Sequence, residues 1–418
     1  MPADGHAPGR LARRLGKSDA VVIGLGSMIG AGVFAAPGPA AAAAGNGLLI
    51  GLAIAALVAY CNATSSAQLA AIYPESGGAY VYGRERLGEL AGFVAGWGFV
   101  IGKLASCAAI AMTFGSYAAP SLARPLAVAS VAALVAVNYS GVQRTAAVTR
   151  VIVAIVLAAL AVAVAAVWLG GSADPARLWP LEGASPYGVL QSAGFLFFAF
   201  AGYARVATLG EEVVDPERTI PRAIPIALGI ALAVYAAVAV SALAGAGAAA
   251  IATSAAPLAT AVGAGRLGWL APAVRVGAAV ASLGVLLSLI AGVSRTAFAM
   301  AARGDLPRAL SAVHPRHRVP HRAELAVGAI VATVAAVADI RTAIGFSSFA
   351  VLTYYGIANA AAWTLAREQR RWPRALAALG LVGCVVLALA LPPRALLAGA
   401  AVMAAGVAVH LIRRGRAR

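Results

Sequence analysis

The sequence predicts an all-α polytopic membrane protein with twelve transmembrane helices. Hydrophobic residues make up 61% of the 418 residues and charged residues only 11%, and the mean hydropathy is +0.87. The apolar residues fall in long runs, and the basic residues fall mostly in the short stretches between those runs. A soluble chain of this length needs far more charge to cover its surface.

The long uncharged runs locate the spans. Residues 151–169, for example, include no charged side chain. Because an α-helix rises about 1.5 Å per residue, roughly 20 residues cross a hydrocarbon core of about 30 Å. Apolar runs between polar breaks predict twelve spans, at residues 20–44, 47–72, 90–117, 123–140, 147–170, 187–210, 222–246, 271–301, 323–339, 342–365, 375–391 and 395–412.

The distribution of Lys and Arg predicts the orientation. With an even number of spans, both termini lie on one side, together with the loops that follow even-numbered spans. That side receives most of the 32 Lys and Arg residues, and the opposite side receives Arg124, Arg177, Arg266, Arg275, Arg341 and Arg394. The positive-inside rule therefore predicts cytoplasmic termini. The alanine- and arginine-rich composition is typical of a GC-rich bacterial genome, so we expect the bacterial cytoplasmic (inner) membrane.

The composition argues against several other classes. The net charge of +17 would suit a nucleic-acid-binding protein, but the basic residues are shared among short loops and form no single patch with interleaved aromatics. Cys61, Cys107 and Cys384 lie in apolar segments without a CxxC or Cys/His neighbour, so we predict neither disulfides nor a metal or cofactor. No apolar region with a cleavage site follows the basic residues 1–18, so we predict no signal peptide.

Two spans carry unusual glycine-containing segments. The first span contains Gly24, Gly26, Gly30 and Gly32, and the sixth contains the segment 198–203. Glycine is costly inside a helix, so a cluster predicts an unwound segment. Broken helices at matching places in two halves of a transporter indicate a binding site near the middle of the membrane. The alternative is close packing through Gly26 and Gly30, but four glycines exceed what one helix interface needs.

An internal similarity predicts how the spans are grouped. Residues 84–98 open the third span with Arg-Leu-Gly-Glu-Leu-Ala, and residues 263–277 open the eighth with Arg-Leu-Gly-Trp-Leu-Ala. The third and eighth spans correspond if spans 1–5 repeat as spans 6–10. The predicted organisation is a cytoplasmic tail at residues 1–18, a transport core at 19–365 with repeats at about 19–170 and 187–365, and two additional helices with a short cytoplasmic tail at 366–418.

Five motifs are modest singly but specific in their order. They are Gly26-Ser-Met-Ile-Gly-Ala-Gly-Val-Phe34, Pro74-Glu-Ser-Gly-Gly-Ala-Tyr80, Phe197-Phe-Ala-Phe-Ala-Gly-Tyr203, Gly210-Glu-Glu-Val-Val-Asp-Pro-Glu-Arg-Thr-Ile-Pro-Arg222, and Ser294-Arg295 with Met300-Ala-Ala-Arg-Gly-Asp-Leu-Pro307. On these motifs the chain resembles the amino acid–polyamine–organocation (APC) superfamily over essentially its whole length. The resemblance implies a LeuT-like fold: two inverted five-helix repeats, with helices 1 and 6 broken, plus two C-terminal helices.

The resemblance also implies alternating access and an amino-acid-like substrate. It places substrate-binding residues at Ser27, Met28, Ile29, Gly30, Ala31, Gly32, Phe198, Ala201, Gly202 and Tyr203. Free N–H groups at Gly30, Ala31 and Gly32 would hold the substrate carboxylate, as a half-helix N-terminus holds an anion. Carbonyls at Met28, Phe198 and Ala201 would hold the amine. Phe198 would also be an aromatic gate, and ordinary packing is its alternative role.

The sequence departs from the family pattern at two places. Many relatives carry an acidic residue two positions after the glycine of the sixth span, where this chain has Ala204 followed by Arg205. Proton-coupled relatives carry a lysine in the fifth span, at a place that lies near Val156 in this chain, and the whole fifth span here lacks a lysine. The usual coupling group is therefore missing.

Lys103 is the charged residue near the centre of a predicted span. A central lysine costs about 2.5–3.5 kcal/mol on insertion scales, and such residues usually line a cavity. Because burial disfavours the charged form, Lys103 could exchange a proton during transport, which makes protons a predicted coupling partner. It could also pair with an acidic or polar group of the substrate. The alternative is a structural lysine that snorkels or bonds carbonyls.

Other polar residues allow two interpretations each. Arg205 with Glu211 and Glu212 could form a cytoplasmic gate or a fixed structural ion pair. His314, His317 and His321 have spacing that a metal site could use, but five arginines share their loop, which favours a solvated basic loop. Tyr354 and Tyr355 could line the cavity or only pack, and His410 stands alone in the last span.

We therefore predict a secondary transporter for a neutral or acidic amino acid, with the lipid bilayer and protons as its other partners. The alternatives are an amine or polyamine carrier, which acidic cavity groups would favour, and an amino acid exchanger. A membrane enzyme would need a nucleophile paired with a base, or a metal cluster, and the spans contain neither pattern. A sensor would usually add a soluble domain, for which the predicted loops are too short.

Overall fold

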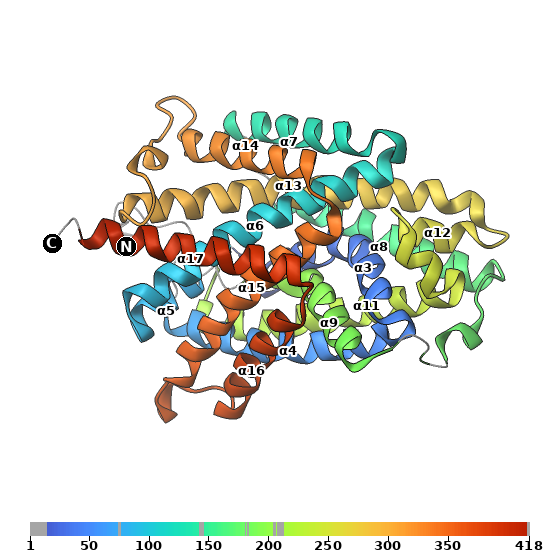
Figure 1. Ribbon diagram of the computed structural model, residues 1–418, viewed down its shortest axis with the longest axis horizontal. Coiled ribbons are helices and arrows are strands. Elements are labelled where there is room, and N and C mark those ends of the chain that lie inside the picture. The colour runs from blue at the N-terminus through green and yellow to red at the C-terminus, as the bar shows by residue number, and fades with distance from the viewer. Residues whose placement is uncertain are drawn as a thin grey trace, which may run out of the picture.

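In the computed structural model, helices joined by short connections make up nearly all of the described residues, which are 15–73, 77–141, 146–179, 181, 184–203, 206 and 213–415 (Figure 1). The α-helices of the first half are α1 (Lys17–Met28), α2 (Ala31–Ala35), α3 (Pro37–Ala44), α4 (Leu48–Ile72), α5 (Ala79–Leu87), α6 (Glu89–Ala118), α7 (Ala123–Tyr139) and α8 (Ala146–Leu169). Those of the second half are α9 (Pro186–Phe200), α11 (Pro216–Thr253), α12 (Pro257–Gly263), α13 (Ala271–Ala302), α14 (His321–Val337), α15 (Ile340–Trp363), α16 (Arg374–Ala390) and α17 (Pro393–Gly415).

Seven short 3₁₀ helices complete the elements of the described chain. They are η1 (Gly45–Gly47), η2 (Pro120–Leu122), η3 (Pro175–Leu178), η4 (Ala201–Tyr203), η5 (Gly268–Leu270), η6 (Arg308–Ser311) and η7 (Arg367–Gln369). An isolated β-bridge joins Leu15 to Val213. The predicted all-α class is confirmed over the part of the chain that the structure describes.

Eight segments of the described residues are long and apolar enough to cross a membrane. They are Lys17–Ala35, Pro37–Ile72, Glu89–Ala118, Pro120–Tyr139, Ala147–Leu169, Pro216–Thr253, Gly268–Ala302 and Pro393–Arg414. Helices α9, α14, α15 and α16 lie at the other four positions where the apolar runs predict spans, and they are shorter or less apolar. The chain is therefore a multi-pass membrane protein.

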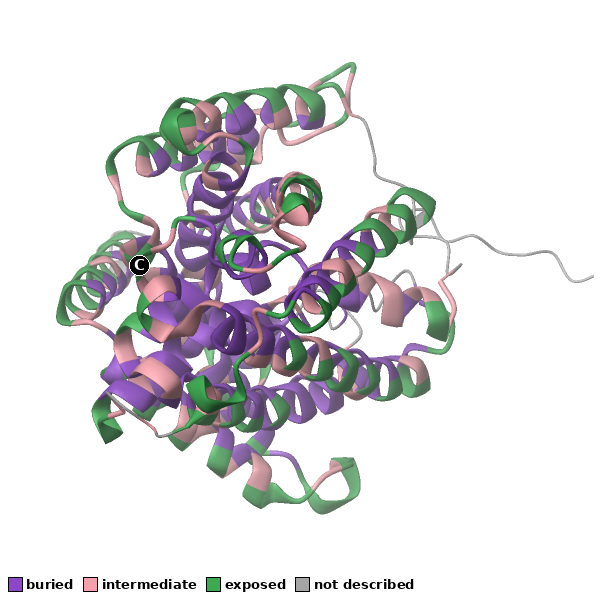
Figure 2. Cartoon of the chain, turned by 90° about the vertical axis from the view of Figure 1, so that its right-hand side faces the viewer, coloured by how far each residue is buried: buried purple, intermediate pink, exposed green. Residues whose placement is uncertain are grey.

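The surface of the bundle has the apolar character that lipid contact requires. Buried residues occupy the centre of the bundle and exposed residues its periphery (Figure 2). Large apolar side chains on that periphery are strongly exposed, among them Leu169 at 76% and Leu397 at 69%. Exposed apolar surface on this scale is a liability in water and is ordinary on a protein that lipid covers.

The first predicted span is broken in the middle. Helix α1 ends at Met28, Gly30 takes an extended conformation (φ −132°, ψ −144°), and α2 begins at Ala31. Helix α2 leads directly into α3, because Ala36 keeps helical dihedrals and donates to the Gly32 carbonyl (2.9 Å). The glycine cluster of the first span therefore corresponds to a real interruption between two helical pieces.

The α-helix of the sixth predicted span also ends within that span, and we call its end together with the turn that follows the second break. Helix α9 ends at Phe200, and a single 3₁₀ turn, η4, follows before the end of the continuously described segment. Ser185 begins α9 as its N-cap, where its hydroxyl accepts from the Gly188 N–H (3.0 Å). Both interruptions come after helices that approach the centre of the bundle.

The helices pack in pairs that recur between the two halves. Helices α6 and α13 pack against each other, and so do α4 and α11. Helix α6 packs on α7 and α15, and α13 packs on α14 and α8. Helix α1 packs on α11 and α8, and α9 packs on α4 and α15. Each of these contacts of a first-half helix therefore has a counterpart in the second half.

The connections gather at two ends of the bundle. At one end the Val214 N–H donates to the Leu15 carbonyl (2.9 Å), and Arg86 Nε donates to the Thr364 hydroxyl (2.9 Å). Helix α5 and the C-terminal end of α17 lie at this end in Figure 1. These contacts join loops that the alternating arrangement assigns to the same side of the membrane.

The opposite end contains the remaining connections. The Asp174 N–H donates to the Ala244 carbonyl (3.0 Å), and the Arg266 N–H donates to the Gly170 carbonyl (3.0 Å). Helix α12 lies at this end, away from α5 (Figure 1). The loops after odd-numbered spans therefore contact one another, as an alternating path through a membrane requires.

Candidate functional site

The two helix breaks lie directly against each other. A Cβ atom on Gly202 would overlap the carbonyl group of Ser27 and would lie 2.7 Å from the Met28 nitrogen. A Cβ atom on Gly32 would lie 2.7 Å from the Ala199 Cα. Glycine is required at these two positions because backbone meets backbone there. The structure thus brings together the two segments that the sequence identified separately.

Tyr235 of α11 connects the two breaks. Its hydroxyl oxygen lies 2.5 Å from the Met28 carbonyl oxygen and 2.9 Å from that of Ala199, so one proton is shared between two carbonyls. Its ring packs edge-on against Phe200 at 4.9 Å between centroids. Sequence analysis missed this residue, since a single tyrosine in an apolar span has no signal that separates it from a packing group.

Replacing Tyr235 with phenylalanine is expected to lower the stability of the protein by about 1–3 kcal/mol. The change leaves the buried Ala199 carbonyl without this donor, and an unpaired buried polar group costs about that much. Thermal unfolding in detergent measures the effect. Tyr187→Phe is the matched control, because Tyr187 is 54% exposed and its hydroxyl is accessible to solvent. Equal unfolding midpoints for the two variants would contradict the bridging role.

Lys103 of α6 reaches the second break. Its ammonium group donates to the Ala201 carbonyl oxygen at 3.3 Å, and the side chain is buried, with 7% of the residue exposed. The Tyr355 hydroxyl of α15 donates to the same oxygen at 3.1 Å. Tyr354 points elsewhere, because its hydroxyl accepts from the Ala79 N–H of α5 (3.1 Å). Of the two adjacent tyrosines, Tyr355 therefore faces the break.

The first break presents a helix N-terminus. Gly30 is the N-cap of α2, and among the described side chains none caps this helix end. A side chain at position 30 would overlap Val285 of α13, so α13 packs directly over the break. Ile29 and Phe198 are buried nearby, at 2% and 8% exposure. The arrangement sets N–H groups of α2 close to the carbonyl end of α9.

Of the remaining predicted site residues, some lie at the breaks and others lie outside the described part of the chain. The Ser27 hydroxyl donates to the Ile23 carbonyl (2.8 Å) within its own helix, and Tyr203 is buried with its ring stacked on that of Tyr355 at 4.9 Å. The candidate gate of Arg205, Glu211 and Glu212 lies outside the described residues. Its geometry stays a prediction.

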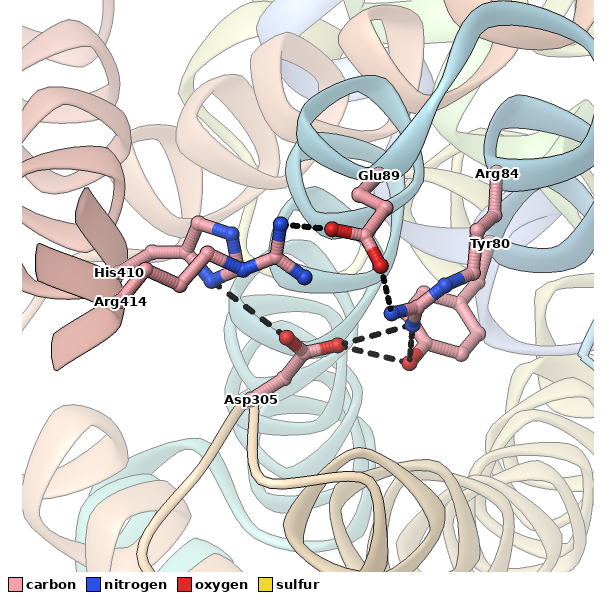
Figure 3. A network of polar contacts seen from close by, with 6 residues as sticks. All are labelled: Tyr80, Arg84, Glu89, Asp305, His410 and Arg414. Atoms are coloured by element: carbon pink, nitrogen blue, oxygen red, sulfur yellow. Dashed lines mark hydrogen bonds and ion pairs between the residues drawn. The ribbon is translucent and has the colours of Figure 1, made fainter. Parts of the chain in front are cut away.

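A second polar cluster lies at the end of the bundle that contains α5 (Figure 3). Asp305, in the connection after α13, accepts from the Tyr80 hydroxyl (2.7 Å) and lies 3.5 Å from Arg84. His410 Nδ1 of α17 lies 3.4 Å from the other carboxylate oxygen. Burial, together with the Asp305 carboxylate, raises the pKa of the Tyr80 phenol. Asp305 therefore joins three elements that are far apart in the sequence.

This cluster corrects the interpretation of His410 as an isolated residue. His410 pairs with an acid from a loop, and its ring stacks on Phe93 at 4.1 Å. Glu89 extends the cluster by pairing with Arg84 (3.2 Å) and with Arg414. Sequence analysis missed the cluster, because it compared His410 only with acids within spans.

The three histidines at the start of α14 and in the connection before it pack together. His314, His317 and His321 surround Tyr139, and the His314 ring lies 4.7 Å from that of His317. His314 Nδ1 accepts backbone N–H groups of Arg316 and His317, so this nitrogen holds the loop in shape. Within the described ranges, no group of His, Cys, Asp or Glu has metal-binding geometry.

Comparison with known proteins identifies transporters that are similar to this chain. The family model described as amino acid permease matches residues 15–409. A transporter of Mycobacterium tuberculosis is 63% identical over 407 residues, which are 97% of this chain and 92% of the relative. The branched-chain amino acid permease of Bacillus subtilis is 27% identical over 89% of this chain and 84% of the relative. Cationic amino acid transporter 4 of Homo sapiens is 28% identical over 82% of this chain and 58% of the relative.

The fold and these matches define a multi-pass membrane transporter, and not an enzyme. The family model covers nearly the whole chain and includes both helix breaks. The chain belongs to the amino acid permease family, which confirms the resemblance inferred from its motifs.

Proposed function

We propose that this protein is a secondary active transporter that moves an amino acid across the bacterial cytoplasmic membrane by alternating access. The observation that carries the proposal is the direct contact of the two helix breaks, Gly202 against Ser27 and Gly32 against Ala199. Broken helices place a helix N-terminus and freed carbonyls inside the membrane, where they can bind the two charges of an amino acid. Unpaired backbone at this depth is tolerated only beside a cavity or within protein.

The proposed architecture has twelve spans, ten of which form two inverted repeats. The recurring helix pairs support this grouping, since spans 1–5 and spans 6–10 make corresponding contacts. The contacts between loops at each end support the alternating path. The excess of Lys and Arg on the side of α5 and α17 supports cytoplasmic termini. The mycobacterial relatives fit a bacterial inner membrane.

The proposed substrate site uses both breaks. N–H groups at the start of α2 bind the carboxylate, where the helix dipole favours negative charge. The amine binds at the carbonyl end of α9, where Ala201 is the C-cap residue. A neutral or acidic amino acid fits best, because the charged side chain that reaches this region in the described structure is Lys103. An amine or polyamine carrier, or an exchanger, is the alternative.

Proton coupling is proposed through Lys103. Lys103 is buried, and its ammonium group donates to the Ala201 carbonyl. It would replace the fifth-span lysine of proton-coupled relatives, which this chain lacks near Val156. A buried lysine can release and rebind a proton as its surroundings change. Transport driven by a proton gradient would use this exchange.

Uptake into liposomes tests the proposed function. The purified protein is reconstituted and offered labelled L-leucine, L-alanine, L-glutamate, L-arginine and putrescine, with and without an inward proton gradient. We expect uptake of a neutral or acidic amino acid that the gradient stimulates. L-Leucine comes first, because the name of the Bacillus relative gives branched-chain amino acids. Uptake of putrescine alone would contradict the carboxylate site, and uptake only by exchange would contradict proton coupling.

A further inference from the structure

The bond between Lys103 and Ala201 puts a positive charge at one particular point of the site. Helix α9 ends at Phe200, so the Ala201 carbonyl lies at the C-terminal, negative end of the helix dipole. Carbonyls released by a broken helix are suitable ligands for a cation. The Lys103 ammonium, 3.3 Å from this oxygen, occupies that cation position from within the protein.

The Lys103 ammonium is not needed to satisfy the backbone there. The Tyr355 hydroxyl already donates to the Ala201 oxygen at 3.1 Å. The corresponding carbonyl of the first break, that of Met28, accepts from Tyr235 (2.5 Å) and from the Gly30 N–H (2.8 Å). Among these two carbonyls, the Ala201 oxygen is the one that a charged side chain contacts in the described structure.

An α-amino acid needs this same oxygen. Its ammonium and carboxylate groups are separated by one carbon, so it requires a negative and a positive helix end close together. The contacts of Gly202 with Ser27 and of Gly32 with Ala199 bring the end of α9 and the start of α2 close together. An amino acid that binds across the two breaks therefore meets Lys103 where its own ammonium group should lie.

We propose that the ammonium group of Lys103 occupies, in the empty carrier, the position that the substrate ammonium takes in the loaded carrier. This inference rests on the proposed function. Binding then replaces one ammonium by another on the Ala201 carbonyl, and Lys103 must leave that oxygen. Lys103 is accordingly a specificity-determining residue that weakens the binding of every ligand with an amine and spares ligands without one.

The first test detects the cation position without any transport. Lys103→Ala removes the side chain beyond Cβ, and propylammonium has the size and charge of the part removed. We expect propylammonium to raise the thermal unfolding midpoint of Lys103→Ala, with no rise for the wild type. 1-Propanol, which is similar in size and uncharged, should raise neither. An absent response of Lys103→Ala, or an equal response of the wild type, would overturn the proposal.

The second test measures the competition between the two ammonium groups. It uses Lys103→Met, which keeps all but the last atom of the side-chain length and removes the charge. The ligands are L-leucine and 4-methylpentanoate, which is L-leucine without its amino group. We expect the affinity for L-leucine relative to 4-methylpentanoate to rise by about tenfold or more in Lys103→Met, the value of one charge-assisted hydrogen bond. An unchanged ratio would identify a structural lysine, and a lower ratio would identify a partner for the substrate; either result overturns the proposal.

The two tests separate this inference from the function on which it rests. If the wild-type protein takes up no amino acid, the proposed function fails, and the propylammonium response still reports whether a cation position exists. If uptake is measured and Lys103→Met leaves the L-leucine to 4-methylpentanoate ratio unchanged, the function stands and the role of Lys103 fails.

Discussion

Replacing Gly202 with alanine is expected to abolish transport. The added methyl group would overlap the Ser27 carbonyl, so two backbone segments would have to separate. Overpacking of this kind costs about 1–3 kcal/mol even where side chains can adjust, and here the obstacle is backbone. Separation would also move the Ala201 carbonyl away from the first break. Uptake per mole of reconstituted protein measures the result.

The control for this prediction is Gly292→Ala in α13. No atom lies within 4 Å of a Cβ atom at position 292, so the methyl group has space. Alanine is also a better helix former than glycine by about 0.5–1 kcal/mol, so this variant should fold and transport as well as the wild type. Wild-type uptake by Gly202→Ala would show that close contact between the breaks is not required.

Replacing Asp305 with asparagine is expected to cost about 3 kcal/mol of stability. The side chain is only 5% exposed, and it faces Arg84 and Tyr80 of α5 and His410 of α17. Asparagine keeps the shape and removes the charge, so the paired cation loses its partner in a poorly solvated position. Breaking a buried ion pair in this way costs about 3–5 kcal/mol, and the partial exposure of Arg84, at 22%, favours the lower value.

Glu89→Gln is the matched control for Asp305→Asn. It makes the same chemical change in the same cluster, but the Glu89 side chain is 53% exposed. An exposed ion pair contributes about 0–1 kcal/mol, so this variant should unfold close to the wild-type midpoint. Thermal unfolding in detergent, followed by the loss of monodisperse protein, compares the two. Similar losses in both variants would contradict the special role of the buried carboxylate.

The sequence predicted those structural features that depend on the residues of a single helix. Glycine is costly inside a helix, so the cluster at Gly24–Gly32 predicted a break that the structure places at Ile29 and Gly30. Long apolar runs predicted helices, and most helices begin and end within a few residues of the predicted bounds. Helix α11 is longer than its predicted span, 222–246, by six residues at its start and seven at its end. Lys103 was identified because a charged residue in an apolar span is energetically costly, so such a residue usually has a functional or structural role.

Features made by several helices could not be predicted in the same way. The bridge by Tyr235 depends on how α11 lies against α1 and α9, and nothing local distinguishes this tyrosine. The partner of Lys103 is a backbone carbonyl, which every residue possesses. Asp305 and His410 are separated by more than a hundred positions and meet only through tertiary packing.

The most direct test of the central claim is protection of a cysteine at the second break. Ala201→Cys is introduced after Cys61, Cys107 and Cys384 are replaced by alanine, and labelling by a maleimide is followed with and without L-leucine. Ala309→Cys, on the exposed surface of η6 in the connection after α13, is the control. The account predicts that L-leucine slows labelling at position 201 and leaves position 309 unchanged. Uptake of L-leucine with equal labelling at position 201 would contradict a substrate site at the helix breaks.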